Sequence, residues 1–276
     1  MSPAIEGSSP SFRVRVATPA DHPAVARLFL ELGVPDPTPT LDDFAHVMLP
    51  RILVLDEGGE ARGYIYWQVY GRTAHVTHLV VAPRLRGRGA GRALMNAVRA
   101  IVVGEGCERW YLQVKRDNAA AIRLYERCGL RTELEAWAMR LAWTQIAALP
   151  GPRVTLTVFT PSPDDDAAVA ARFGIDVERL ARLRSWPGRI FVALREGDAL
   201  VAFSAFDPTA SKAHSFRVAR LEIAAPLLDA LRGHARPEGP ATVHFPVEGD
   251  RALVDALVAV GAEIGFEILR MQADLR

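Results

Sequence analysis

Apolar residues recur at every second position in some segments of this chain and at every third or fourth position in others, so strands alternate with amphipathic helices. In the first half, the shorter period predicts strands at 12–17, 52–55, 63–69, 73–81, 109–114 and 131–141. The longer period predicts helices over 19–32, from 42 onward, over 90–103 and over 118–127. This order of elements predicts an α/β fold built on a mixed sheet.

Turn and capping residues support these boundaries. Thr18-Pro19-Ala20-Asp21 supplies an N-cap, a proline in the first turn and an acidic residue at the positive end of the helix dipole. Glu57-Gly58-Gly59-Glu60 is typical of a hairpin turn. Gly129 is placed to end a helix. Pro150-Gly151-Pro152 predicts a linker between two parts of the chain.

The second half of the chain repeats the first. The strand, turn and strand at 52–67 recur at 190–205, an offset of 138, whereas Gly129 recurs as Gly261, an offset of 132. Agreement in strands, turns and helix ends favours a duplication. We therefore expect a flexible N-terminus at 1–11, a first domain at 12–145, a linker at 146–153 and a second domain at 154–276.

A turn rich in arginine and glycine lies between the strand at 73–81 and the helix at 90–103. Residues 84–92 contain four arginines and three glycines, and no acidic residue lies between Val76 and Val103. Glycines let successive backbone N–H groups point inward, and the following helix adds its own N–H groups and the positive end of its dipole. This combination predicts a cradle for a phosphate or pyrophosphate. The corresponding segment of the second half, 221–228, contains no glycine.

Composition narrows the class of protein further. The chain of 276 residues is 50% hydrophobic with a net charge of +1, which fits a globular protein without a basic field for nucleic acid or membranes. Two cysteines, Cys107 and Cys128, predict no disulfide framework. No apolar run approaches the roughly 20 residues that cross a bilayer, and the first residues show no signal pattern. We expect a cytoplasmic protein that binds neither nucleic acid nor membranes.

The histidines and the run of three aspartates at 164–166 do not form a metal-ligand pattern. After Pro161-Ser162-Pro163, the aspartates are typical of the first turn of a helix. The sequence therefore predicts no metal site.

Two motifs in the first half resemble the GNAT superfamily of acetyl-coenzyme-A-dependent N-acetyltransferases. The signature Arg/Gln-x-x-Gly-x-Gly/Ala is met by 86–91, after a strand that ends Leu79-Val80-Val81. A second signature, an Asn that opens a helix followed by an aromatic residue and a Gly-aliphatic pair, is met by Asn118, Tyr125 and Gly129-Leu130. The resemblance covers about residues 12–142. It implies a tandem GNAT-like fold with two copies, the second of them degenerate.

The resemblance also implies how acetyl-CoA is held as co-substrate. The backbone of Leu79, Val80 and Val81 would pair with the pantetheine arm as a strand would. The pyrophosphate would be bound by the amides of Gly87, Gly89, Ala90 and Gly91 and by the side chains of Arg86, Arg88 and Arg92. Asn118 would cap its helix and also contact the cofactor arm.

Transfer of an acetyl group from a thioester to an amine needs a base, an oxyanion donor and an acid. In the family, the acid that protonates the leaving thiolate lies where Tyr125 stands, and Val81 N–H is placed to stabilise the oxyanion. Relatives carry Glu or His on this strand, eleven residues before the Arg/Gln of the signature, so the resemblance implies His75 as the possible base. His78 is the other histidine of this strand, and its odd spacing from His75 puts it on the opposite face unless a bulge intervenes.

The second half lacks the cradle, and Asp250 and Leu257 replace Asn118 and Tyr125. We expect an architectural role for it, and expect a fragment 1–145 to bind acetyl-CoA without it. The favoured function is acetylation of a primary amine on a small molecule or peptide. The alternatives are a non-catalytic acyl-CoA-binding or regulatory module and a protein N-terminal acetyltransferase. An internal pseudo-dimer would make a monomer sufficient, although a homodimer remains open.

Overall fold

The computed structural model describes residues 12–33 and 37–275, so the expected flexible segment 1–11 lies outside the described residues. The chain forms two compact units. Unit 1 comprises residues up to Gln113, Ala119–Arg131 and the chain from Met271 onward. Unit 2 comprises Val114–Asn118 and Thr132–Arg270.

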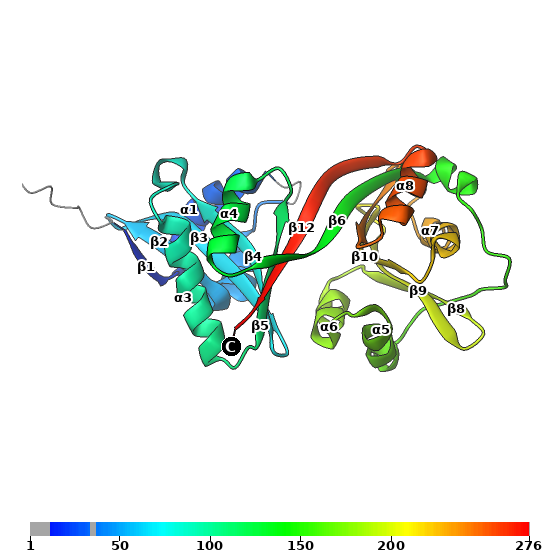
Figure 1. Ribbon diagram of the computed structural model, residues 1–276, viewed down its shortest axis with the longest axis horizontal. Helices are drawn as coiled ribbons and strands as arrows, with labels where there is room; N and C mark the ends of the chain where they lie inside the picture. The colour runs from blue at the N-terminus through cyan, green and yellow to red at the C-terminus, as the bar shows by residue number, and fades with distance from the viewer. Residues whose placement is uncertain (1–11, 34–36, 276) are drawn as a thin grey trace, which may run out of the picture. The chain divides into compact units, whose positions relative to one another are not determined.

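The elements of unit 1 follow the predicted order (Figure 1). The strands are β1 (Arg13–Val16), β2 (Ile52–Glu57), β3 (Glu60–Tyr70), β4 (Thr73–Val81) and most of β5 (Arg109–Lys115). The α-helices are α1 (His22–Phe29), α2 (Leu41–Asp43), α3 (Ala90–Gly104) and α4 (Ala119–Arg127). Short 3₁₀ helices are η1 (Pro19–Asp21), η2 (Leu30–Leu32), η4 (Leu49–Arg51) and η5 (Pro83–Leu85), and η3 (Phe44–Met48) is a π-helix.

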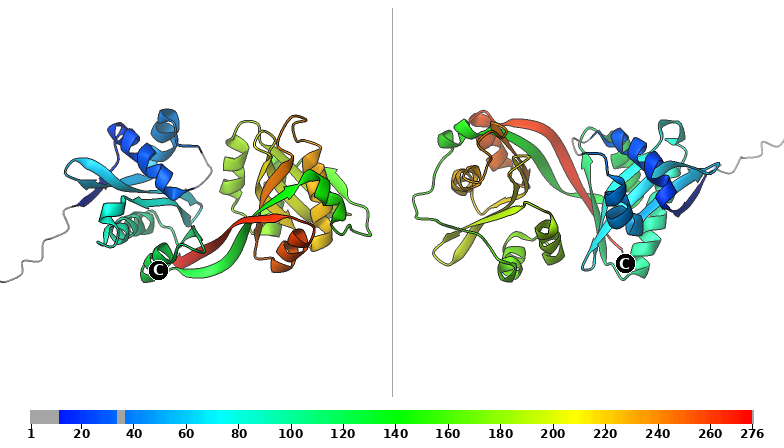
Figure 2. Two further views of the ribbon diagram at one scale, coloured as in Figure 1. Left: turned by 90° about the horizontal axis from the view of Figure 1, so that it is seen from above. Right: turned by 180° about the vertical axis from the view of Figure 1, so that it is seen from behind.

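Helices cover both faces of the sheet in unit 1. Helix α1 and the helical segment before β2 lie on one face, and α3 lies on the other (Figure 2). The first face buries a cluster that includes Val25, Phe44 and Val80. Helix α3 buries four side chains longer than alanine, Leu94, Met95, Val98 and Val102. This repeat of three to four residues is the amphipathic pattern seen in the sequence.

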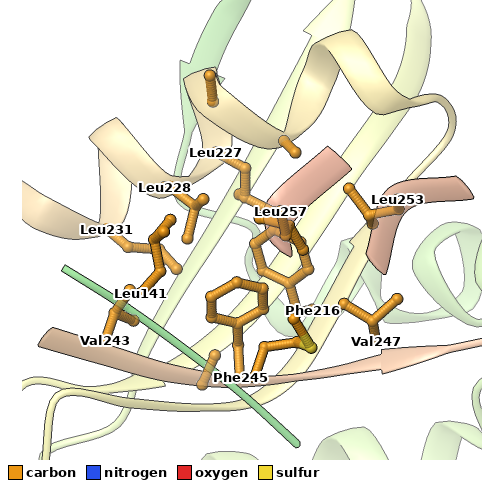
Figure 3. Packing of buried hydrophobic residues seen from close by; sticks show 14 of the residues in the cluster. Leu141, Phe216, Leu227, Leu228, Leu231, Val243, Phe245, Val247, Leu253 and Leu257 are labelled. Atoms are coloured by element: carbon orange, nitrogen blue, oxygen red, sulfur yellow. The ribbon is translucent and has the colours of Figure 1, made fainter. Parts of the chain in front are cut away.

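Unit 2 has the same arrangement. Its strands are β6 (Arg131–Ala142), β7 (Thr157–Phe159), β8 (Ile190–Glu196), β9 (Ala199–Asp207), β10 (Lys212–Val218), β11 (Thr242–Glu248) and most of β12 (Glu263–Asp274). Its helices are α5 (Asp166–Phe173), α6 (Val177–Ser185), α7 (Ala224–Arg232) and α8 (Arg251–Ala259). Figure 3 shows Leu227 and Leu231 of α7 and Leu253 and Leu257 of α8 packed near Phe216 and Phe245.

The two units repeat one topology, which confirms the predicted α/β fold with a mixed sheet in two copies. In each unit a meander of three antiparallel strands, β2-β3-β4 or β8-β9-β10, is followed by a helix and a strand that pairs parallel to the third. The two repeats differ in length between the paired strands, which recur at an offset of 138, and the glycine that recurs at an offset of 132. Helix α3 has 15 residues and α7 has nine.

The final strand of each sequence half contributes to the unit formed mainly by the other half. Strand β6 follows α4 in the chain, yet it pairs antiparallel with β11 from Ala142–Thr242 to Ala136–Glu248. The end of β12 belongs to unit 1, where the Leu275 N–H donates to the Glu108 carbonyl at 2.8 Å. The compact units therefore differ from the linear halves 12–145 and 154–276. Pairing of strands distant in sequence causes the difference, and local patterns do not encode such pairing.

Candidate active site

Strands β4 and β5 separate along their length. Their parallel pairing runs from Thr73–Arg109 to Val76–Leu112, and residues 77–81 of β4 have no partner in β5 in this register. On its other side, β4 stays paired with β3 as far as Val81. The predicted backbone contacts of Leu79, Val80 and Val81 thus fall on the part of β4 that β5 leaves open. Of these three residues, only Val80 is buried in the core.

The arginine- and glycine-rich turn leads from β4 through η5 into α3. Gly87 and Gly89 have φ values of 76° and 84°, a conformation that glycine adopts at little steric cost. A Cβ atom on either residue would meet no heavy atom within 4 Å, so the space beside this backbone is open. Gly89 is the N-cap of α3, and Ala90 begins the helix. The turn therefore offers backbone groups and a helix N-terminus toward open space.

Gly91 has a different role in the same turn. A Cβ atom there would lie 2.8 Å from Leu124 Cδ2, so the glycine lets α4 pack closely against the start of α3. This contact holds the helix that carries Tyr125 beside the turn.

The four arginines of the turn differ in their partners. Arg84 forms an ion pair with Glu57. Arg86 Nε donates to the Val81 carbonyl at 2.9 Å, and its Nη2 lies 2.8 Å from Glu31 Oε2. Among the described residues, Arg88 and Arg92 form no ion pair with a carboxylate, and both side chains are exposed. These two guanidinium groups are the ones available to an anion.

Tyr125 lies on α4 and is 7% exposed. Burial raises the pKa of its hydroxyl above the ordinary value, and the nearby Cys128 adds to the shift. Burial also raises the pKa of the Cys128 thiol, an effect that the charge of Arg92 opposes. Cys128 is therefore close to both Arg92 and Tyr125. The Tyr125 hydroxyl keeps its proton at neutral pH and can act as a proton donor.

A bulge in β4 places both histidines of the strand on one face. Tyr66 pairs with His78 and Trp67 pairs with Val76, so Thr77 is an extra residue in β4. Gln68 pairs with His75. Because Tyr66 and Gln68 are two residues apart on β3, they share a face, and their partners His78 and His75 share it too.

The two histidines have different neighbours. The His75 ring stacks on Tyr111 of β5, with centroids 4.4 Å apart and planes inclined by 5°. The His78 ring contacts Phe29 of α1 at 5.4 Å and Tyr66 at 5.5 Å between centroids. His78 Nδ1 lies 3.4 Å from the Tyr64 hydroxyl.

Polar side chains of β3 extend this face. Gln68 Nε2 donates to the Tyr66 hydroxyl at 2.7 Å, and the Tyr70 hydroxyl donates to Gln68 Oε1. Sequence reasoning did not select Glu31, Tyr66, Gln68 or Tyr111. The alternation of Tyr64, Tyr66, Gln68 and Tyr70 along one strand was the signal for the shared face, whereas nothing local links Glu31 to Arg86.

Asn118 precedes α4, and its N–H donates to the Lys115 carbonyl at 3.0 Å. By its contacts it belongs to unit 2, whereas Tyr125 and the turn belong to unit 1. The role of Asn118 at the cofactor stays a prediction.

The corresponding turn of unit 2 has no cradle. Among the described residues, none between Ser211 and Gly249 has a positive φ. The segment forms η8 (Leu221–Ile223), and α7 then begins with the buried side chains Ala224 and Ala225. Leu257, at the position of Tyr125, is fully buried.

Other candidate chemistry from the sequence has structural explanations. Asp166 forms an ion pair with Arg184 at 2.7 Å, and Asp165 accepts from Ser162 N–H at 2.8 Å. Within residues 12–33 and 37–275, no group of three or more His, Cys, Asp and Glu side chains could hold a metal ion. No helix in these ranges is long and apolar enough to cross a membrane.

Comparison with known proteins shows which family and which relatives this chain resembles. Residues 23–130 match the acetyltransferase (GNAT) family. An acetyltransferase of Pectobacterium atrosepticum is 32% identical over 80 residues, which is 29% of this chain and 57% of that protein. The chain thus spans little more than half the length of this curated relative.

Solved structures resemble the whole chain. A GCN5-related N-acetyltransferase from Sphaerobacter thermophilus has a TM-score of 0.68 at 22% identity, over 96% of each chain. A putative acetyltransferase from Pyrococcus horikoshii has a TM-score of 0.67 at 15% identity, over 99% of this chain and 92% of that one. A tandem GNAT protein from the clavulanic acid biosynthesis pathway has a TM-score of 0.61 at 17% identity, over 96% and 99%. Residues 23–130 therefore match the acetyltransferase (GNAT) family in sequence, and the whole chain shares the fold of these acetyltransferase structures, a tandem one among them.

Proposed function

We propose that unit 1 transfers an acetyl group from acetyl-CoA to a primary amine of a small molecule or peptide. The observation that carries the proposal is the turn of Gly87 and Gly89, which presents open backbone at the N-terminus of α3. Such a turn suits a pyrophosphate. It begins where β4 has left β5, so a pantetheine arm bound in the turn has an unpaired strand beside it.

The exposed guanidinium groups of Arg88 and Arg92 support the pyrophosphate part of the site. Arg86 is already held by Val81 and Glu31, so its contribution depends on releasing Glu31. The N–H groups of 87–91 and the dipole of α3 add an anion-binding field. This arrangement binds the cofactor at its charged part and directs the thioester along β4.

The reaction is a direct attack by the amine nitrogen on the thioester carbonyl carbon. The C–N bond forms, the carbonyl electrons move to oxygen, and the backbone N–H of Val81 stabilises that oxyanion. The C–S bond then breaks, and the thiolate takes a proton from the Tyr125 hydroxyl. Burial suits Tyr125 to this step because it keeps the hydroxyl protonated before the thiolate leaves.

An alkyl amine has an ordinary pKa of about 10, so a base must remove a proton before or during attack. His75 is the proposed base, acting directly or through water, and a neutral imidazole can accept a proton near neutral pH. The bulge at Thr77 makes His78 a second candidate, because both imidazoles lie on one face of β4. The distance of 3.4 Å from Tyr64 places a hydroxyl within reach of His78 Nδ1.

The test is a screen for coenzyme A release from acetyl-CoA with alkyl amines, aminoglycosides, polyamines and peptides as acceptors. The proposal expects release with at least one class, and expects Tyr125→Phe to abolish most turnover while acetyl-CoA still binds. Release with none of these acceptors, together with retained binding, would favour a non-catalytic acyl-CoA-binding module. Turnover confined to peptide N-termini would favour a protein N-terminal acetyltransferase. A cytoplasmic location, and either a monomer with an internal pseudo-dimer or a homodimer, belong to the same proposal.

A further inference from the structure

Arg86 is held by two groups on the rim of the proposed cofactor site. Its Nε donates to the carbonyl of Val81 at the end of β4, at 2.9 Å. Its Nη2 donates to Glu31 Oε2 at 2.8 Å. The side chains of Arg86 and Glu31 are 53% and 43% exposed, so water and ions reach the pair.

Glu31 belongs to η2, the short helix that directly follows α1. Both α1 and η2 contact β4. Two residues before Glu31 along the chain, the Phe29 ring lies against His78. The Glu31–Arg86 pair therefore joins the phosphate-binding turn to the helices that cover the histidine-bearing face of the sheet.

The chemistry of the pair creates a competition. A guanidinium binds a phosphate and a carboxylate through the same N–H groups. A pyrophosphate bound at Gly87 and Gly89 would lie next to Arg86 in the chain, and Glu31 occupies the Nη2 donor. An ion pair this exposed contributes little to stability, so a doubly charged ligand can displace the carboxylate.

We propose that Glu31 is a positioning residue that competes with the acyl-CoA pyrophosphate for Arg86, so that cofactor binding releases η2 from the turn. This inference rests on the proposed acyl-CoA function. Displacement frees the Glu31 carboxylate and the segment after α1 at the moment the cofactor arrives. Cofactor binding thereby loosens the segment that packs over the face carrying His75 and His78.

Under this proposal, a substitution beside the binding site strengthens acetyl-CoA binding, whereas such substitutions usually weaken it. Glu31→Gln removes the competing charge and is expected to tighten acetyl-CoA binding by about two- to five-fold, the range set by an exposed ion pair. A purely structural role for Glu31 would weaken binding instead. Arg86→Gln should weaken binding, and Glu31→Gln should have no effect in that background because the two residues act through one contact.

Calorimetric titration of the full-length chain tests this, with acetyl-CoA and with S-acetylpantetheine, which lacks the pyrophosphate. Glu57→Gln is the matched control, because it removes the same charge from the partner of Arg84 in the same turn. The expected result is tighter acetyl-CoA binding by Glu31→Gln alone, with S-acetylpantetheine binding unchanged.

Unchanged or weaker acetyl-CoA binding by Glu31→Gln would overturn the inference and leave the proposed function intact. An equal gain with Glu57→Gln would also overturn it, since the effect would then be a general change of charge. If the unmodified protein binds no acetyl-CoA, both the inference and the proposed function fail.

Discussion

His75 and His78 lie on the same face of β4. In a regular strand, two residues three positions apart would lie on opposite faces. The extra residue Thr77 restores the shared face. His75 stacks on Tyr111, whereas His78 contacts Phe29 and Tyr66. Two imidazoles are thus presented beside the part of β4 that is proposed to hold the thioester.

The first prediction separates these histidines. His75→Ala should lower kcat by about 10²-fold or more if its imidazole is the general base, and His78→Ala should lower kcat less. Both variants should keep the acetyl-CoA affinity of the unmodified protein, because neither histidine is in the turn. Steady-state kinetics with the best acceptor, measured from pH 5.5 to 9, checks this. A larger loss for His78→Ala would transfer the role to His78, and no loss for either would remove the histidines from the mechanism.

The second prediction concerns the proton donor. Tyr125→Phe should reduce kcat by about 10²- to 10⁴-fold while acetyl-CoA affinity changes little, because only the hydroxyl is removed. Since burial raises the pKa of Tyr125, this hydroxyl should not produce an alkaline loss of activity below about pH 10. Tyr70→Phe, at another buried tyrosine of unit 1, is the control for loss of a hydroxyl. Full turnover by Tyr125→Phe would show that another group protonates the thiolate.

The third prediction concerns stability in acid. Arg15 hydrogen-bonds Asp21 at 2.7 Å and Asp56 at 2.7 Å, and these bonds hold the pKa of each carboxyl below its ordinary value. The folded state therefore binds fewer protons than the unfolded state in acid. The stabilisation is complete above the unfolded pKa of about 3.9 and is lost as pH falls through the lower folded values.

Thermal unfolding followed by circular dichroism between pH 2 and 7 measures this effect. Arg15→Met should lower Tm at pH 7 and flatten the acid dependence, because the aspartates lose their shared partner. Arg13→Met is the matched control, since Arg13 is 76% exposed and lies 3.8 Å from Asp56. Equal effects of the two substitutions would contradict the account.

The fourth prediction follows from the exchange of strands between sequence halves. Met271 and Leu275 are buried and belong to unit 1. Met271→Ala should destabilise the protein by about 2–5 kcal/mol through loss of buried contacts. A chain truncated before Met271 should lose cooperative unfolding of unit 1.

The same exchange changes the expectation for the fragment 1–145, which lacks the end of β12 and leaves β6 without β11. We expect this fragment to aggregate or unfold rather than to bind acetyl-CoA. Near-ultraviolet circular dichroism of the fragment and of the truncated chain checks both outcomes. A folded fragment 1–145 that binds acetyl-CoA would show that the exchanged strand is dispensable.

Local chemistry explains why much of the fold was predictable. The strand at 73–81 and the starts of α3 and β5 match their predicted boundaries. Their signals are local, because Pro83, Gly89 and the alternation of apolar residues determine the conformation of the backbone next to them. The matching meanders follow from the internal repeat. The exchanged strands were missed because β6 and β11 are separated by about a hundred residues, and no short pattern states which strands pair.

The candidate site was predictable to the same extent. The turn at 84–92 was visible because glycine conformation and arginine charge are local properties. The shared face of His75 and His78 depends on the bulge at Thr77. The sequence predicted opposite faces unless a bulge intervened, and it could not show whether one did. The Glu31–Arg86 ion pair joins residues 55 positions apart, and only tertiary structure brings them together.

Binding stoichiometry tests most directly the central claim that unit 1 alone carries the acyl-CoA cradle. Calorimetric titration of the full-length protein should give one acetyl-CoA per chain. Gly89→Ala, which forces a φ of 84° on a side chain, should weaken binding by about ten-fold, a strain of roughly 1–2 kcal/mol. Gly58→Ala also forces a positive φ, 62°, on a side chain in the β2–β3 turn, and should leave the affinity unchanged. Two acetyl-CoA molecules per chain, or one that Gly89→Ala does not affect, would contradict the claim.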